Sequence, residues 1–495
     1  MNKYRFDLVD ELDNDEWEST IGYERESIKP VLTLLNYRVH DSVNLEGTIY
    51  RLLEHDYVPS NCSFISRTII IPLLAILLHF LTRFNSKKTC APVCVLVSNT
   101  FEESKRYEIV KSELLNRISY YSIGSFVDSI DFSATTRLGC LYNSIKRLNN
   151  PHSLPFLGFS VSGFRLKKLC SVYCKYWIQS KRCGEHVDSL LIEKLFDGIE
   201  KEFLKRKKKV KKWLKDKNID AFVTINQFKL RDLIIIEACH DLGIKTINMD
   251  HAVMQIAASQ SVKSVPIKSI NFTELVLVCN SNEEDFRNRH FDYYNPVYCM
   301  GQSITSCGFL ELTYEYAIEC LKKYRASKRI VYMESGWSVD FCEKGFESSY
   351  EEYRKKVLYQ LKELSDRTGY KVRVRYRPYW REERRTNEKK ILDDYGFEIS
   401  ESIPQNLMQD VVESYVVISE ISNVLFTSSI LGRKTYMIVE KGNNCCVLDK
   451  RINTVNVDDI SELKLDDILY KEVDIDKNDF FNADVFFKMC KRDKD

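Results

Sequence analysis

The strongest constraint in this sequence is an alternation of short apolar runs with longer amphipathic segments in the middle of the chain. Residues 220–226 (DAFVTIN) and 245–250 (KTINMD) have the length and apolar content of buried strands. Between them, residues 230–243 (LRDLIIIEACHDLG) have helical length and end on Gly243, a residue type that commonly follows the last helical turn. Strand, helix and strand with short connections predict parallel pairing in a doubly wound α/β sheet.

The alternation extends on both sides of this unit. Residues 93–99 (VCVLVSN) predict an earlier strand, and residues 274–280 (ELVLVCN) predict a later one followed by a helix from Ser281. Residues 296–301 (PVYCMG) predict one more strand before the pattern is interrupted. These segments predict a first α/β domain.

A second series of the same kind follows a helical connector at residues 312–324. Its predicted strands are 329–335 (RIVYMES), 370–378 (YKVRVRYRP), 413–419 (ESYVVIS) and 434–440 (KTYMIVE), and its predicted helices are 348–369 and 422–432. The chain has 495 residues, a length that favours two domains over one. We therefore predict two Rossmann-like doubly wound parallel-sheet domains, at residues 91–305 and 306–470, facing a cleft. Residues 1–90 are expected to form a mostly helical extension, and residues 471–495 a helix or tail.

Composition narrows the class of partner and the compartment. The chain has 73 Lys and Arg against 71 Asp and Glu, so no global field favours a nucleic-acid partner. Its 16 cysteines are scattered without a CxxC pair, which indicates reduced thiols and a cytoplasmic protein. The acidic N-terminal stretch lacks the apolar core of a secretory signal.

Two segments raise the question of contact with a membrane. Thr68–Leu81 is strongly apolar but shorter than a span, which leaves a core helix, an in-plane membrane helix and a true span as alternatives. Lys201–Lys217 is rich in lysine, and its apolar residues could form one stripe: Phe203, Leu204, Val210, Trp213 and Leu214. Peripheral binding to an anionic surface, on the inner face of the plasma membrane, is one interpretation, and a solvated helix face is the other.

The first candidate site stands at the end of the strand KTINMD. Asp250 and His251 come directly after the apolar run, and parallel sheets bind ligands at the carboxyl ends of their strands. An acid and an imidazole at such an end could provide a catalytic base. The alternative is a turn in which Asp250 caps the next segment and His251 is packed.

The second candidate site combines three strand ends of the second series. Ser335 and Gly336 follow the strand at 329–335, and glycine allows backbone amides to approach a phosphate closely. Arg373, Arg375 and Arg377 alternate along the next strand and share one face. The third strand ends in Ser419, Glu420, Ser422 and Asn423, with Ser422 expected at a helix N-cap. Together these residues predict a site for a diphosphate-bearing ligand.

Several motifs of other enzyme classes are absent from the sequence. No GxGxxG follows a strand and no GxxxxGK[ST] occurs, which disfavours dinucleotide oxidoreductases and P-loop NTPases. No HExxH or paired Cys/His spacing indicates zinc. The two DxD matches, Asp13–Asp15 and Asp474–Asp476, lie in charged terminal stretches and are interpreted as chance. We expect neither a metal nor a cofactor.

With these elements in place, the sequence resembles the two-domain GT-B glycosyltransferases of bacterial surface polysaccharide synthesis, of capsule, lipopolysaccharide or teichoic acid type. The similarity is carried by NMDHA, LVLVCNSNEEDF, PVYCMGQS, VRVRYRP and VVISEISNVLFTSSILGRKTYMI, and it covers roughly residues 90–470. Those enzymes often have Gln-His-Gly where this chain has Asp250, His251 and Ala252, and they hold the donor phosphate with a serine loop before a helix.

The resemblance implies an activity and a division of labour. The first domain would bind a glycan or lipid-linked acceptor and supply the base, and the second would bind a nucleotide-sugar donor without a metal. A sugar-nucleotide 2-epimerase, a polyol-phosphate transferase and a non-catalytic scaffold of a polysaccharide assembly complex remain alternatives. The donor, the acceptor and the stereochemistry do not follow from the sequence.

Overall fold

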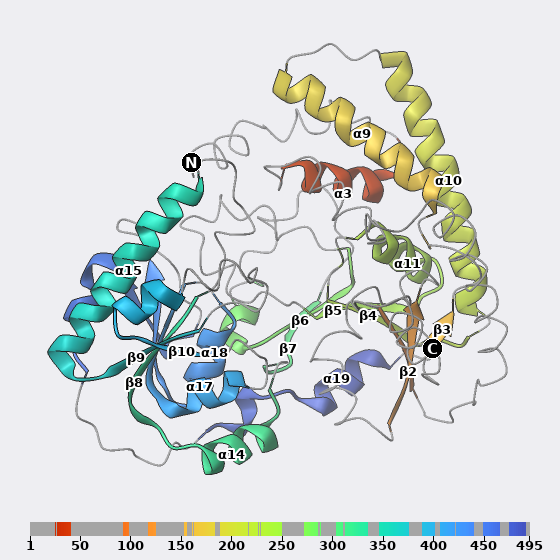
Figure 1. The fold of residues 1–495 in the computed structure, drawn as a ribbon. Coiled ribbons are helices and arrows are strands. Elements are labelled where there is room, and N and C mark those ends of the chain that lie inside the picture. The colour runs from red at the N-terminus through yellow and green to blue at the C-terminus, as the bar shows by residue number, and fades with distance from the viewer. Residues whose placement is uncertain are drawn as a thin grey trace, which may run out of the picture.

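The fold consists of two parallel β-sheets with helices on both faces (Figure 1). The computed structural model describes residues 25–40, 93–98, 117–124, 153–155, 161–183, 189–249, 272–288, 303–334, 346–375, 389–400, 406–439, 449–465 and 475–491, except 26, 162, 216, 226, 228, 286, 287, 310, 311 and 421. Within this part of the chain, one sheet precedes the other in sequence.

The first sheet has seven described strands in the order β3-β2-β1-β4-β5-β6-β7, all paired in parallel. Its strands are β1 (Val93–Ser98), β2 (Ile118–Gly124), β3 (Ser153–Pro155), β4 (Ala221–Thr224), β5 (Lys245–Met249), β6 (Leu275–Val278) and β7 (Ser303–Ser306). The order runs outward in one direction from β1 and then in the other from β4, which is the doubly wound pattern.

The second sheet has six described strands in the order β10-β9-β8-β11-β12-β13, again all parallel. They are β8 (Ser327–Met333), β9 (Lys371–Arg375), β10 (Glu398–Ser400), β11 (Ser414–Ser419), β12 (Lys434–Val439) and β13 (Ile452–Asn456). The two sheets thus repeat one topology, and the predicted fold class of two doubly wound domains is confirmed. The domain boundaries themselves stay a prediction.

Most of the predicted strands and helices are present where the described residues cover them. The predicted strand at 296–301 lies outside the described residues, and β7, which begins after it at Ser303, was not predicted. Strands β2, β3, β10 and β13 had not been predicted.

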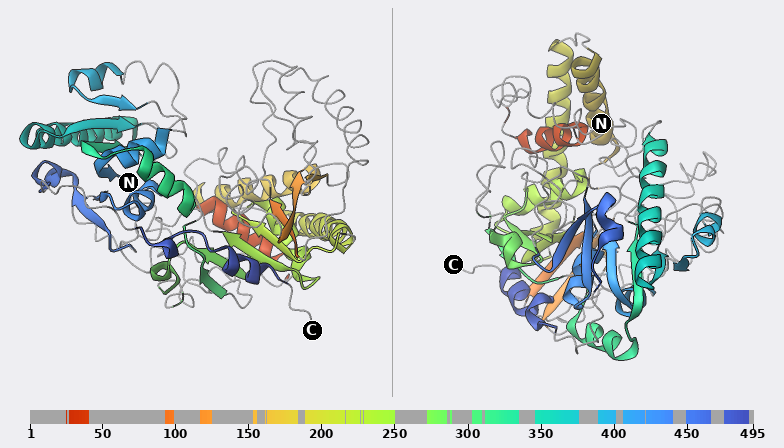
Figure 2. Two further views of the ribbon diagram at one scale, coloured as in Figure 1. Left: turned by 90° about the horizontal axis from the view of Figure 1, so that it is seen from below. Right: turned by 90° about the vertical axis from the view of Figure 1, so that its left-hand side faces the viewer.

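Helices cover the first sheet on both faces. On one face α11 (Leu230–His240) packs on the sheet, with α3 (Lys29–His40), α9 (Phe164–Cys183) and α10 (Ser189–Lys215) joining the same core. Helix α3 is the described part of the expected N-terminal helical extension, and it lies within this core. On the other face lies α19 (Ala483–Cys490), which comes from the far end of the chain (Figure 2).

The second sheet is covered by helices of its own series. One face packs against α15 (Phe346–Thr368), and the other packs against α14 (Tyr314–Lys323), α17 (Leu407–Glu413) and α18 (Val424–Ile430). Along β9, Val372 and Val374 face α15 while Arg373 and Arg375 face α17. The predicted alternation of this strand is therefore confirmed for its described residues.

The C-terminal segment ties the second series back to the first sheet. The amide of Asn482 donates to the carbonyl of Cys307 at 2.8 Å, and the amide of Phe309 donates to the carbonyl of Asp479 at 2.7 Å. Gly308 lies between these bonds with φ of +78°, and a Cβ there would come within 1.9 Å of the Phe480 carbonyl oxygen. Only glycine fits at this crossing, which lets α19 reach the first sheet.

The predicted apolar stripe on the lysine-rich helix faces inward, not toward a membrane. Phe203, Val210, Trp213 and Leu214 are buried in the core of the first domain, and Leu204 alone of the five is exposed. The same helical spacing of apolar residues is expected for a stripe on the surface and for a face that packs against α9 and α11. The expectation that these apolar residues form one outward stripe is therefore wrong, and peripheral membrane binding stays a prediction. Thr68–Leu81 lies outside the described residues.

The described cysteines are packed thiols. Eight of them are free, and seven of those eight are buried. Burial raises the pKa of Cys174 and of Cys307 to about 12, so almost none of either thiol is ionised at neutral pH. These side chains serve the core and are poor candidates for a nucleophile.

Candidate functional site

Each sheet has a point where its strand order reverses, and ligands of open parallel sheets bind beyond the carboxyl ends of the strands at such points. In the first sheet the reversal lies between β1 and β4, and in the second it lies between β8 and β11. The side chains at these four strand ends, and at the neighbouring ends of β5 and β9, form the candidate site.

A row of neutral polar side chains crosses the carboxyl end of the first sheet. Thr224 stands opposite Asn248, and extending the β1–β4 register by one residue places Ser98 beside Thr224. Paired residues of parallel strands share a face, so the three side chains lie in one line. Ser98 and Thr224 are fully buried, and Asn248 is 5% exposed.

One buried ion pair supports this row from α11. The hydroxyl of Thr224 donates to Asp232 Oδ2 at 2.7 Å, and Arg231 Nε donates to Asp232 Oδ1 at 2.9 Å. Gln227 Oε1 accepts the amide of Phe272 at 2.6 Å, which fixes the segment after β4 against the start of β6. The row therefore stands on a rigid, hydrogen-bonded base.

Asn248 differs from its neighbours in this row. Within the described part of the chain, its buried Oδ1 atom has no hydrogen-bond partner. A buried amide oxygen without a partner is unfavourable by about 1–3 kcal/mol, so such an atom calls for an explanation such as a ligand. The residue stands two positions before Asp250. Asp250 and His251 lie outside the described residues, and their catalytic role stays a prediction.

A corresponding row crosses the second sheet. The register places Arg375 of β9 opposite Met333 of β8, and Ser419 of β11 opposite the same Met333. The Ser419 hydroxyl donates to the Met333 carbonyl at 2.6 Å, which holds the ends of β8 and β11 together. The structure thus brings Arg375 and Ser419, two of the residues predicted from sequence, to one face of adjoining strand ends.

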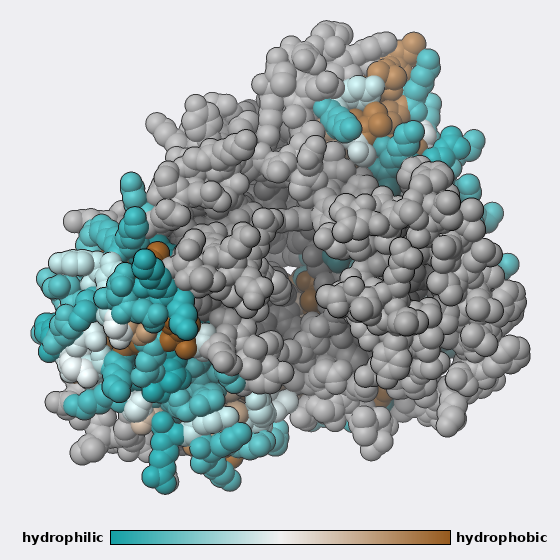
Figure 3. Space-filling view, in the orientation of Figure 1, coloured by the Kyte–Doolittle hydropathy of each residue, from teal (hydrophilic) through white to brown (hydrophobic). Residues whose placement is uncertain are grey.

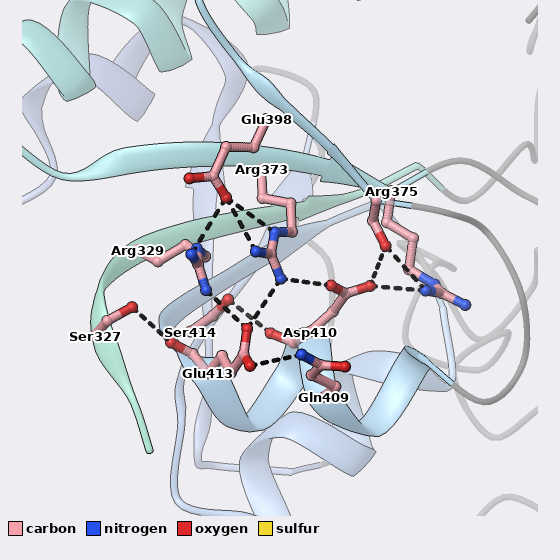
Figure 4. A network of polar contacts seen from close by, with 10 residues as sticks. Ser327, Arg329, Arg373, Arg375, Glu398, Gln409, Asp410, Glu413 and Ser414 are labelled. Atoms are coloured by element: carbon pink, nitrogen blue, oxygen red, sulfur yellow. Dashed lines mark hydrogen bonds and ion pairs between the residues drawn. The ribbon is translucent and has the colours of Figure 1, made fainter. Parts of the chain in front are cut away.

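Arg375 belongs to a network of buried charges beneath this row (Figure 4). Its Nη1 atom donates to Asp410 Oδ2 at 2.7 Å and to Ser400 Oγ at 3.2 Å. The other carboxylate oxygen of Asp410 accepts from Arg373 at 2.9 Å, and Arg373 also contacts Glu398 and Glu413. Asp410 already neutralises the charge of Arg375. To bind a phosphate as predicted, the Arg375 guanidinium would have to contact Asp410 and the phosphate at the same time, and this role stays a prediction.

The network also changes the titration of Arg373. Burial alone would lower the pKa of its guanidinium, but the hydrogen bonds and charges of Asp410 and Glu398 raise it. Arg373 is therefore charged at all relevant pH values. In this network the three guanidinium groups are matched by three carboxylates, those of Glu398, Asp410 and Glu413.

Two carboxylates stand at the strand ends on the opposite face of the second sheet. Glu334, directly after β8, pairs with Arg354 of α15 at 3.0 Å, and both side chains are buried. Glu420, directly after β11, accepts a hydrogen bond from the hydroxyl of the buried Tyr332. Glu420 was predicted as a site residue, and the structure gives it this tyrosine contact.

The remaining predicted residues divide into two groups. The N-cap of α18 is Asn423 rather than Ser422, so that expectation was wrong by one residue. The Ser422 hydroxyl instead accepts the amide of Val424 at 3.4 Å, a weaker version of the same cap. Ser335, Gly336 and Arg377 lie outside the described residues.

Sequence reasoning missed much of this arrangement. The residues it did not single out are Ser98, Thr224, Asp232, Asn248, Glu334, Arg354 and Asp410. Asn248 could have been found, because Thr246 and Asn248 alternate with Ile247 and Met249 along KTINM and so place polar groups on one face. Asp410 has no such local signal, since its two arginine partners are 35 or more residues away in the chain.

Comparison with known proteins gives similarity of structure without similarity of sequence. No protein-family model and no curated protein matches the chain. Among solved structures, it is similar to UDP-GlcNAc 2-epimerase from Neisseria meningitidis bound to UDP-GlcNAc (TM-score 0.42, 9% identity, 75% of this chain and 89% of that one). It is also similar to UDP-GlcNAc 2-epimerase from Methanocaldococcus jannaschii (0.42, 12%, 80% and 98%) and to MurG from Acinetobacter baumannii (0.36, 9%, 75% and 88%). The activities in those names belong to those proteins.

Among the described helices, none has the length and apolar character needed to cross a membrane. Within the same part of the chain, no cluster of three or more His, Cys, Asp or Glu side chains is arranged to hold a metal ion.

Proposed function

We propose that this protein is a metal-independent glycosyltransferase that moves a sugar from a nucleotide-activated donor to a glycan or lipid-linked acceptor in surface polysaccharide synthesis. The observation that supports this most is the different chemistry at the two points of strand reversal. The first sheet ends in hydroxyl and amide groups, and the second ends in an arginine on one side of β8 and a serine on the other.

These two chemistries suit two different ligands. Hydroxyl and amide side chains donate and accept hydrogen bonds at once, as a sugar with many hydroxyls requires. An arginine guanidinium matches the geometry and charge of a phosphate. The first domain is therefore assigned to the acceptor and the second to the donor nucleotide.

Each group of residues then has a role in the reaction. Asp250 or His251, just beyond β5, takes the proton from the acceptor hydroxyl as it attacks the sugar. Arg375, Arg377 and the serines at 335, 419 and 422, with Gly336, Glu420 and Asn423, bind the donor and stabilise the charge that grows on the leaving phosphate. An acceptor carried on lipid places the protein in the cytoplasm, at the inner face of the plasma membrane.

The proposal is tested by adding CMP, CDP, UDP and GDP separately and measuring the melting temperature. One of them should raise it, because a ligand that binds only the native state stabilises that state. Arg377→Ala should weaken binding of that nucleotide by about 10- to 150-fold, the effect of losing a charge-assisted hydrogen bond. Arg325→Ala, at an exposed position of the second domain, is the matched control.

The alternatives give different results in the same system. If no nucleotide changes the melting temperature, the proposal is wrong and a non-catalytic scaffold is favoured. An epimerase would release free UDP from a UDP-sugar with no acceptor present. A polyol-phosphate transferase would consume a CDP-polyol and leave every nucleotide-sugar unchanged.

A further inference from the structure

The outward face of α10 combines lysines and exposed leucines in one stripe. Its exposed residues are Leu190, Leu191, Lys194, Asp197, Lys201, Leu204, Lys205, Lys208, Lys209, Lys212 and Lys215. At 3.6 residues per turn, all of them fall within an arc of roughly 140° around the helix axis. We call this stripe the α10 outer face.

Few carboxylates oppose this charge on α10 itself. Asp197 lies within the first half of the face and Glu193 lies at its edge, and Arg25 binds both, at 2.6 and 2.7 Å. Glu202 is buried and lies near Arg165 and Lys205. From position 203 to position 215 the helix has no acidic residue. The outer face is therefore strongly positive over its second half.

The lysines of α10 fall into two sets with different partners. Lys207 and Lys211 turn toward α11, where they pair with Asp241 at 3.0 and 2.8 Å. These inner lysines hold the two helices together. Packing of α10 on α11 accounts for the inner set, and it leaves the lysines of the outer face without a structural role of this kind.

The exposed leucines are not required by the core. Leu190 is 59% exposed, Leu191 is 40% exposed and Leu204 is 43% exposed, while the other apolar residues of the helix are wholly or partly buried. Brown apolar atoms bordered by hydrophilic ones are visible at the upper end of the α9 and α10 region in Figure 3. Large apolar side chains standing in water among lysines suit a surface that is both anionic and apolar beneath.

We propose that the α10 outer face docks in the plane of an anionic lipid bilayer. The lysines would contact lipid phosphates, and the three leucines would enter the boundary between headgroups and acyl chains. A helix of 27 residues is about 40 Å long, enough for many headgroups at once. An acidic polymer such as nucleic acid would match the lysines but would give no reason for the exposed leucines.

This surface is independent of the strand-end sites and does not rest on the proposed function. Docking would hold the first domain against the bilayer whatever reaction the protein performs. It is also distinct from Thr68–Leu81, so a loss of binding caused by changes on α10 alone identifies the surface.

The test uses the full-length protein and sedimentation with vesicles of phosphatidylcholine, with and without phosphatidylglycerol. Changing Lys201, Lys208, Lys209 and Lys212 together to Gln should lower partition onto anionic vesicles by about a hundredfold, and high salt should mimic the change. Lys205 is left in place because it contacts Glu202. The control is Gln at four exposed lysines of the second domain: Lys322, Lys355, Lys389 and Lys390.

A second variant tests the apolar half of the proposal. Replacing Leu190, Leu191 and Leu204 together with Ser should lower partition onto anionic vesicles by about five- to tenfold and leave heparin binding unchanged. The proposal is overturned if the four-lysine variant sediments with anionic vesicles as well as its control does. It is equally overturned if the leucine variant keeps full vesicle binding, because the face would then be a general polyanion site.

Discussion

The two sheets share one strand order but place their charges in different positions. In the second domain, Arg373 and Arg375 rise from the sheet itself and meet Asp410 in a buried network. In the first domain the described strand ends are neutral, and most of the described ion pairs have at least one partly exposed partner, including three that join α10 to α11. Arg231–Asp232 is the buried exception. Sheets of the same topology therefore differ in whether charged side chains stand on their strands.

The difference has a physical consequence for each domain. Removing charge from water is unfavourable unless partners compensate, so a buried network tolerates little movement. A neutral row of hydroxyls and amides can exchange one hydrogen-bond partner for another at a smaller free-energy change. The second domain is thus suited to a ligand of fixed charge and geometry, and the first to a ligand of variable hydroxyl arrangement.

The largest effect is expected from Asp410→Ala. Asp410 is 2% exposed and binds two arginines, so its removal leaves one buried and one partly buried positive charge with fewer partners. We expect a loss of about 3–5 kcal/mol in the free energy of unfolding, measured by urea titration. Asp366→Ala, at a side chain 59% exposed, should change it by less than about 1 kcal/mol.

Asp232→Ala in the first domain sharpens this result. Asp232 is fully buried but contacts one arginine, Arg231, and the hydroxyl of Thr224. Asp232→Ala should lower the free energy of unfolding by less than Asp410→Ala does, because one positive charge rather than two loses its partner. A larger loss at Asp232 would contradict the contrast drawn between the domains.

The sequence predicted the sheets better than it predicted the sites. Strand and helix patterns are local, so the units around β4, β5, β11 and β12 could be read from hydrophobic periodicity. Short edge strands such as β3 and β10 have three residues each, too few for a periodic signal. Tertiary pairing alone makes them strands.

The sites depended on contacts that no local pattern encodes. The alternation of β9 correctly placed Arg373 and Arg375 on one face, but it could not reveal that Asp410 would occupy that face. The prediction of an outward apolar stripe on the lysine-rich helix was wrong for a related reason. The apolar residues of α10 pack against α9 and α11, and local spacing does not reveal these partners. In both examples the surroundings of the side chains depend on residues that are distant in sequence.

A smaller effect on stability, with a separate effect on activity, is expected from Asn248→Val. Valine suits a buried strand position, and the change removes an amide oxygen that has no hydrogen-bond partner among the described residues. The free energy of unfolding should stay the same or rise by up to about 1 kcal/mol, while turnover falls at limiting acceptor. Urea titration and initial rates measure the two quantities.

Thr246→Val is the matched control on the same strand and face. The Thr246 hydroxyl accepts the Glu274 amide at 2.9 Å and contacts His240 Nε2 at 3.1 Å, so its loss should destabilise by about 1–2 kcal/mol. If Asn248→Val destabilises more than Thr246→Val, Asn248 is a structural residue and the neutral row loses its assignment to a ligand.

The smallest effect concerns the surface pairs of the first domain. Burial alone would raise the pKa of Asp241, but hydrogen bonds from Lys211 and Lys207 lower it below its usual value. This pairing stabilises the fold above the pKa of an unfolded aspartate, about 3.9, and is lost as the pH falls through the lower folded value. Because the Asp241 side chain is 34% exposed, the contribution should not exceed about 1 kcal/mol.

Changing Lys207 and Lys211 to Gln should flatten the acid limb of the stability curve, measured by urea titration at successive pH values. The outward pair Lys208 and Lys212 changed to Gln should leave its slope intact, and equal slopes for both variants would mean that the inner and outer lysines of α10 do not differ as described.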